Sequence, residues 1–193
     1  MWNSMKRKRS ARNRRARRCL FLILLALLAL LLIWPRTVHL EGLVSPYAIL
    51  VDADSGEAVA EKKADVSIYP ASMTKVMTAL LALEANPDLE QPVTLPEDIF
   101  PELRAEGASM AGFRPGETAT VRDLLYGALL PSGAECCEAL AREVSGSEEA
   151  FVELMNQKAA ELGMRSTHFC NSTGLHDPEH VSTVRDMARL LRA

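Results

Sequence analysis

The sequence predicts an α+β fold in which a β-hairpin precedes a group of helices. Residues 48–51, Ala-Ile-Leu-Val, form a short apolar run typical of a buried strand, and residues 57–61 alternate polar and apolar side chains as a second strand does. Residues 52–56, Asp-Ala-Asp-Ser-Gly, lie between them and are typical of a turn, so the two strands should pair at a sheet edge. Downstream, apolar residues recur at helical spacing in several segments.

The predicted helices have recognisable ends. The first begins at Pro70-Ala71-Ser72 and ends at Asn86, because Pro87 disfavours helical geometry in the residue before it. Thr120 is the expected N-cap of the second helix, with Asp123 completing a near capping box. Residues 88–119 are rich in Pro and Gly and should form a long excursion that shapes one side of a cleft. Further helices are expected at residues 135–144, at 148–162 between a Ser147 cap and Gly163, and from about residue 183.

Charge divides the chain into two regions of opposite sign. Residues 1–18 hold nine Lys or Arg and no acid, which leaves 13 basic against 25 acidic residues, a net charge of about −12, for the rest of the 193-residue chain. An acidic domain behind a basic stub is not the pattern of a nucleic-acid-binding protein. We expect no cofactor, since no phosphate-binding glycine-rich loop is visible, and no metal, since Pro178 separates His176 from His180 and no Cys or carboxylate cluster completes a site.

Residues 19–34 are an uncharged apolar run that predicts a transmembrane signal anchor. At about 1.5 Å per residue this segment spans roughly 24 Å as a helix, slightly less than the roughly 30 Å hydrocarbon core. Arg18 and Trp34 can make up the difference by reaching the two interfaces. The positive-inside tendency would keep residues 1–18 in the cytoplasm as a basic stub and export the remainder.

A cleavable signal peptide is the alternative interpretation of this N-terminal region, because it too has a basic segment followed by an apolar one. The apolar run is longer than most signal-peptide h-regions, and residues 35–41 offer no Ala-x-Ala cleavage site. We therefore expect an uncleaved anchor followed by a short linker at residues 35–45.

Ser72-Met73-Thr74-Lys75 places a hydroxyl and an amine three residues apart at the start of an apolar helix. Residues i and i+3 share a helix face, so Lys75 should lie within hydrogen-bonding reach of the Ser72 hydroxyl. Apolar neighbours would favour the neutral amine, which could then act as a base toward a serine nucleophile. A Ser-x-x-Lys match also occurs about once by chance in a chain of this length, and a solvated lysine on a buried helix is the ordinary alternative.

A second serine and a cysteine pair interrupt the later helical patterns. Pro131-Ser132-Gly133 breaks the helix and would present Ser132 at the wall of a cleft, although a plain polar loop residue explains this position equally well. Cys136 and Cys137 are adjacent on a predicted helix, where their side chains point about 100° apart. A bridge between them would be strained, so they are expected to be small buried hydrophobes.

Six segments of the chain carry a family resemblance: Tyr47–Gly56, Pro70–Glu84, Gly112–Glu117, Val121–Gly127, Leu162–Phe169 and Asn171–Leu175. Together they resemble the D-Ala-D-Ala carboxypeptidases, the low-molecular-mass penicillin-binding proteins of bacterial cell-wall metabolism. The resemblance implies a β-lactamase/transpeptidase-like architecture, with an antiparallel sheet covered by helices, a helical subdomain beside it, and a catalytic cleft between them. The catalytic domain would span residues 46–193, with its later strands expected from sequence beyond residue 193.

The same resemblance implies roles for three residues. Ser72 would attack the carbonyl of the D-Ala-D-Ala bond of a peptidoglycan stem peptide, Lys75 would accept its proton, and Ser132 would relay the proton to the departing D-Ala amine. Water would then release the shortened peptide, and β-lactams would be covalent inhibitors of the same serine. The implied location is the outer side of the bacterial cytoplasmic membrane, or the exterior if the N-terminal segment is cleaved.

The chain departs from the family pattern in two places. The family's middle motif is Ser-x-Asn, whereas Ser132-Gly133 is followed by Ala134, and Glu135 is longer and starts one position later. The third motif, Lys-Thr-Gly on a strand, is expected beyond residue 193. Two alternatives therefore remain: a membrane-tethered non-catalytic module that binds cell wall or a protein partner, and a serine β-lactamase, which would share the Ser72–Lys75 pair but not the other segments.

Overall fold

The computed structural model describes residues 23, 25, 38–40 and 42–193, which divide into a unit ending at Val38 and a unit from His39 to Ala193. The expected anchor at residues 19–34 lies outside the described residues, except for Ile23 and Leu25. No helix in the described part of the chain is long and apolar enough to cross a membrane. The elements that position the candidate site all belong to the second unit.

The predicted hairpin is present. Strands β1 (Ala48–Val51) and β2 (Ala58–Lys62) pair in antiparallel fashion, with β2 beginning one residue later than the sequence predicted. The turn between them is closed by Asp52, whose Oδ1 accepts a hydrogen bond from the Ser55 N–H at 2.8 Å. Gly56 follows with φ +75°, a conformation that glycine adopts at little cost.

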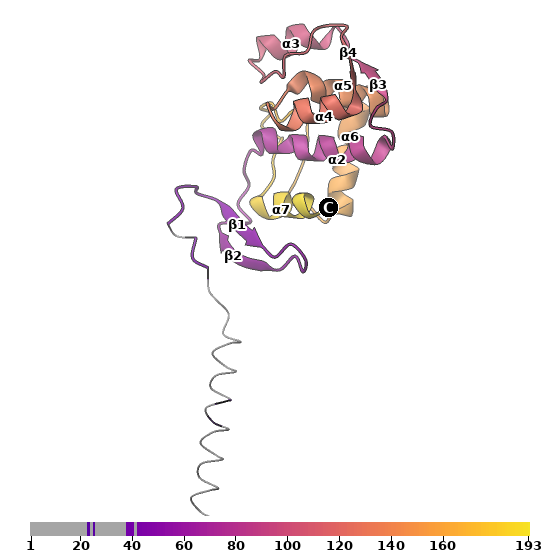
Figure 1. Ribbon diagram of the computed structural model, residues 1–193. Helices are drawn as coiled ribbons and strands as arrows, with labels where there is room; N and C mark the ends of the chain where they lie inside the picture. The colour runs from indigo at the N-terminus through magenta and orange to yellow at the C-terminus, as the bar shows by residue number, and fades with distance from the viewer. Residues whose placement is uncertain (1–22, 24, 26–37, 41) are drawn as a thin grey trace, which may run out of the picture. The chain divides into compact units, whose positions relative to one another are not determined.

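The antiparallel sheet that the resemblance implied was expected to draw its later strands from sequence beyond residue 193. The described residues form two separate two-stranded sheets, β1–β2 and β3 (Pro92–Thr94) with β4 (Thr118–Thr120). A two-stranded ribbon is marginal in water, and the hairpin is supported by helix α7 (Val184–Arg192), which packs beside β1 (Figure 1). Arg185 of α7 fastens this contact, because it pairs with both Glu61 of β2 and Asp65.

The helical part is built around α2 (Lys75–Ala85), which lies in the middle of the unit in Figure 1. Helices α4 (Val121–Leu129), α5 (Ala134–Ser145) and α6 (Glu148–Glu161) pack against it, as does α7. The core has two parts, one around α4 and α5 and one around α2, α6 and α7. Their largest fully buried apolar side chains are Phe100, Phe151, Phe169, Met77, Leu95, Leu124, Leu140 and Met155.

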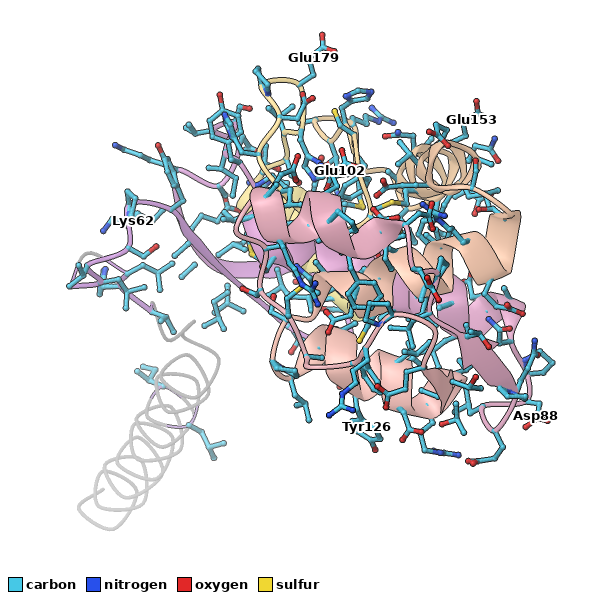
Figure 2. All side chains as sticks on the ribbon, turned by 90° about the horizontal axis from the view of Figure 1, so that it is seen from above. Lys62, Asp88, Glu102, Tyr126, Glu153 and Glu179 are labelled. Carbon is cyan, nitrogen blue, oxygen red and sulfur yellow. The ribbon has the colours of Figure 1, made fainter. Side chains whose placement is uncertain are left out.

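The predicted helix starts are confirmed at atomic detail. Thr120 Oγ1 accepts from the Asp123 N–H at 3.1 Å, while Asp123 Oδ2 accepts from the Thr120 N–H at 3.2 Å, which is a complete capping box. Ser147 caps α6 by accepting from the Ala150 N–H, and Thr183 caps α7 in the same way. Outside these caps the unit is acidic on its surface, and Glu153 and Glu179 project into solvent in Figure 2.

One helix was missed. Residues 88–119 were expected to hold only short extended pieces, but they also contain α3 (Ile99–Ala105). Ile99, Phe100 and Leu103 are buried there, so three side chains on one face hold two turns of helix against the core. Pro101 lies in the first turn, where its missing N–H has no intrahelical partner to lose. Seven residues are too few for a helical period to be read from the sequence.

Candidate active site

Ser72 lies in a single 3₁₀ turn, η1 (Ala71–Thr74), that leads directly into α2 at Lys75. In a 3₁₀ turn residues i and i+3 are eclipsed, which aligns these two side chains more closely than the α-helical start that was expected. Lys75 Nζ lies 3.3 Å from Ser72 Oγ, within hydrogen-bonding distance. Ser72 is exposed, whereas only 4% of Lys75 is accessible, so an accessible hydroxyl stands over a buried amine.

Ser132 completes a cluster of three polar side chains. Its hydroxyl donates to Ser72 Oγ at 2.9 Å, from the turn between α4 and α5. This position is set by a tight turn in which Ser132 has φ +64°, a conformation uncommon for a residue other than glycine. Gly133 must also be glycine, because a Cβ there would lie 2.8 Å from the carbonyl oxygen of Gly127 and 2.6 Å from Cβ of Ala111.

The surroundings of Lys75 suit a base. Its Nζ donates to the carbonyl oxygen of Thr173 at 2.5 Å. Burial lowers the pKa of Lys75, while Cys137 and Glu135 oppose that shift. Burial also raises the pKa of Cys137 to about 12, so its thiol is neutral at ordinary pH and Glu135 is the opposing charge that acts there. At a given pH, the neutral form of Lys75 is therefore more populated than that of a solvated lysine.

The Thr173 carbonyl is aimed at Lys75 by a loop that the sequence analysis did not identify as part of the site. Asn171 Oδ1 accepts from the N–H groups of Thr173 and Gly174, at 3.2 and 2.7 Å. This side-chain turn is a common use of asparagine, and Asn followed three residues later by Gly was the available signal. The loop places a backbone acceptor 98 residues along the chain next to the amine.

Two further contacts fix this loop against the helices. Thr78 of α2 donates to the Ser172 carbonyl at 2.6 Å, and Glu148 of α6 accepts from the Ser172 N–H and hydroxyl, both at 2.8 Å. Gly174 has φ +80° and lies so close to η1 that a Cβ there would stand 2.0 Å from the carbonyl oxygen of Ala71. The Ser72 turn and the Asn171–Gly174 loop therefore form one tightly packed assembly.

His180 supports the η1 turn through a contact with Thr74. Its Nε2 lies 2.8 Å from Thr74 Oγ1, and its Nδ1 accepts from the Cys170 N–H at 3.3 Å. A backbone N–H can only donate, so Nε2 carries the proton of a neutral ring, in keeping with the burial that lowers the pKa of His180. His176 instead packs edge-on against Tyr69, with ring centroids 4.8 Å apart. Within the described ranges, no group of three His, Cys, Asp or Glu side chains is placed to hold a metal ion.

The residues after Ser132 are buried. Ala134 is 1% exposed, and its N–H donates to the Ser109 carbonyl at 2.8 Å. Glu135 does not take the place of an asparagine side chain on Lys75, because its Oε1 accepts from the N–H groups of Ala111 and Gly112, at 2.7 and 2.9 Å. The next two residues are free, buried cysteines, as the sequence predicted.

A cleft adjoins the loop whose Thr173 carbonyl contacts Lys75. Its volume is about 550 Å³, and α3, α5, α6 and the loop that contains Thr173 line it. Its lining is rich in acidic side chains, with Glu102, Glu138 and Glu148 among them and Arg142 as a counter-charge. None of Ser72, Lys75 and Ser132 lines it, so the cleft is not where these three side chains meet.

The Ser72 hydroxyl and the desolvated Lys75 amine at the start of one helix, together with the Ser132 hydroxyl from the turn before α5, form an arrangement that suits a serine nucleophile with a lysine base. The chain belongs to the D-alanyl-D-alanine carboxypeptidase family, which it matches over residues 36–193. It is 42% identical over 153 residues to D-alanyl-D-alanine carboxypeptidase DacC of Escherichia coli, covering 75% of this chain and 38% of the relative. It is 39% identical over 141 residues to DacF of Bacillus subtilis, covering 73% and 36%.

Solved structures agree with this assignment. Penicillin-binding protein 6B of Escherichia coli superposes with a TM-score of 0.75 at 29% identity, over 82% of this chain and 52% of that one. Penicillin-binding protein 5 of Haemophilus influenzae gives 0.73 at 30% identity, over 80% and 46%. The resemblance seen in the sequence and the penicillin-binding-protein type of fold are thus confirmed. The chain spans less than half the length of the two curated relatives named above.

Proposed function

We propose that the protein is a serine-type D-Ala-D-Ala carboxypeptidase that removes the terminal D-Ala of peptidoglycan stem peptides through an acyl-enzyme on Ser72. The observation that carries this proposal is the contact of Ser72 Oγ with both Lys75 Nζ and Ser132 Oγ, at 3.3 and 2.9 Å. Family membership supports the same reaction. No cofactor takes part.

Lys75 acts as the base in this reaction. A neutral amine has two N–H donors and one lone pair. One N–H is directed to the Thr173 carbonyl, and the lone pair can then accept the Ser72 proton as Oγ attacks the substrate carbonyl. Ser132, which bonds to Ser72 Oγ, passes a proton to the departing D-Ala amine, and the Ser72 N–H stabilises the negative charge that develops on the carbonyl oxygen. Water then hydrolyses the ester.

The non-catalytic module is less well supported. The Ala134 replacement that suggested it leaves all three side chains in contact. The missing asparagine bond would cost roughly 1 to 3 kcal/mol if it leaves a partner unpaired, which slows a reaction without abolishing it. The segments shared with the carboxypeptidases also favour this activity over that of a β-lactamase.

Fluorescent penicillin tests the proposal, because a β-lactam mimics the D-Ala-D-Ala bond and leaves an ester on the nucleophile. The full-length natural protein should label on the peptide that contains Ser72, and excess unlabelled penicillin should block the reaction. Ser72→Ala should abolish labelling without lowering the unfolding temperature. Residues 1–193 alone should label slowly or not at all, since the resemblance assigns the β-lactam carboxylate to the third motif. A folded full-length protein without a Ser72 adduct would refute the proposal.

We also propose that residues 19–34 anchor the protein in the bacterial cytoplasmic membrane with the catalytic domain outside. The support is the apolar run behind nine basic residues and the lack of an Ala-x-Ala site after it. N-terminal sequencing of the exported protein decides between anchor and cleaved signal. A mature N-terminus between residues 35 and 46 would contradict the anchor.

A further inference from the structure

Glu135 is a fully buried carboxylate whose contacts are unlike those of a structural salt bridge. It lies in the first turn of α5, three residues after Ser132, and none of its surface is accessible. Oε1 bridges the N–H groups of Ala111 and Gly112, at 2.7 and 2.9 Å, while Oε2 is buried without a hydrogen-bond partner. A buried polar atom without a partner is costly, and an apolar side chain at this position would avoid that cost.

The two bridged N–H groups belong to the segment that supports the Ser132 turn. The Ala134 N–H donates to the carbonyl of Ser109 in this segment at 2.8 Å. Gly133 is in such close contact with Ala111 that a Cβ on it would not fit. Glu135 therefore ties residues 109–112 to the turn that holds Ser132 against Ser72.

The same side chain also affects the pKa of Lys75. Cys137 and Glu135, both on α5, are the groups that oppose the lowering of the Lys75 pKa, and the thiol is neutral at ordinary pH. The two groups that Lys75 Nζ contacts, the hydroxyl of Ser72 and the carbonyl of Thr173, carry no charge. The facing residues 109–113, Ser-Met-Ala-Gly-Phe, bring no charged side chain to Glu135 either. A negative charge in a dry site interacts more strongly than it would in water.

We propose that Glu135 is a positioning residue for acylation: it fixes the Ser132 turn through the Ala111 and Gly112 amides and provides the counter-charge for the Lys75 ammonium. The inference rests on the proposed function, because the ammonium forms when Lys75 takes the Ser72 proton. The Ser72 oxygen then bonds to the substrate carbonyl carbon, and the negative charge on the carbonyl oxygen is offset by the Ser72 N–H. Glu135 itself transfers no proton in this step.

Glu135→Gln separates the two roles, because its amide oxygen can still accept from both backbone N–H groups while the charge is gone. We expect the pKa of Lys75, followed by NMR titration of isotope-labelled lysine in the full-length protein, to fall in this variant. The acid limb of the penicillin acylation profile should move to lower pH with it. The maximal acylation rate should drop on the order of tenfold, less than the roughly hundredfold or greater loss expected when a general base is removed.

Glu143→Gln is the matched control, since it removes the same charge from the exposed end of the same helix. Its Lys75 titration and acylation profile should equal those of the wild type. Glu135→Ala should also increase hydrogen exchange at Ala111 and Gly112, which the Gln variant should preserve. An unchanged Lys75 titration in Glu135→Gln overturns the inference. A wild type that is folded but forms no Ser72 adduct refutes the proposed function instead, and the NMR titration distinguishes the two failures.

Discussion

Gly174→Ala should disrupt the nucleophile turn from a loop a hundred residues away. The new Cβ would stand 2.0 Å from the carbonyl oxygen and 2.5 Å from the carbonyl carbon of Ala71, both backbone atoms that cannot rotate aside. Overpacking of this kind costs roughly 1 to 3 kcal/mol, and a φ of +80° costs an alanine roughly 1 to 2 kcal/mol more. The sum, a loss of roughly 2 to 5 kcal/mol, corresponds to a fall of roughly 4 to 20 °C in Tm for a domain of this size.

Gly146→Ala isolates the contribution of the contact. Gly146 also has positive φ, +84°, but a Cβ there meets nothing within 4 Å. This variant should lose only the conformational part, roughly 1 to 2 kcal/mol or about 2 to 8 °C. Thermal unfolding followed by circular dichroism gives both values, and the penicillin labelling rate at Ser72 should fall in Gly174→Ala alone. If both variants melt at the same temperature and label equally fast, the close approach to Ala71 does not hold the turn.

Three further predictions follow from single side chains. Ala134→Asn in the full-length protein should speed penicillin labelling by about tenfold per 1.4 kcal/mol of recovered interaction. The reason is that an ammonium at Lys75 has three N–H donors and the structure gives partners to two of them. Slower labelling of this variant would contradict the prediction. Burial and the neighbouring Glu148 raise the pKa of Glu138 above its ordinary 4.5, so the protein should lose stability as the pH rises above that value. Glu138→Gln removes this titration, and its Tm should exceed that of the wild type by a margin that grows from about pH 5 to pH 8. Burial lowers the pKa of His180 below its ordinary 6.5, so the wild type should lose stability as the pH falls below that value. His180→Gln should be less stable than the wild type at neutral pH but should lack this loss on the acid side. For either residue, an equal dependence of Tm on pH in wild type and variant would refute the argument.

The features that the sequence predicted well are local ones. Each of them depends on residues within about one turn of each other. They are the hairpin turn, the capping box at Thr120, the Ser147 cap and the end of α2 before Pro87. Helix α3 was not predicted, because seven residues are too few to show the recurrence of apolar side chains at helical spacing. The resemblance implied one larger sheet, whereas the described strands form two separate pairs.

The candidate site shows the same difference between local contacts, which the sequence predicted, and contacts between distant residues. The sequence by itself determined that Ser72 and Lys75 face each other, since three residues of helical backbone suffice to align them. The meeting of Ser132 with Ser72, 60 residues apart, rested on the family resemblance until the structure gave the contact.

Only the tertiary structure decided what surrounds the pair. The Thr173 carbonyl reaches Lys75 from 98 residues away, His180 reaches Thr74 from 106 residues away, and Glu135 binds backbone N–H groups 24 and 23 residues upstream. Backbone donors and acceptors are the same at every position, so no residue type marks the ones that will be used. Which of them meet a given side chain depends on how the helices and loops pack, and that packing is a property of the whole unit.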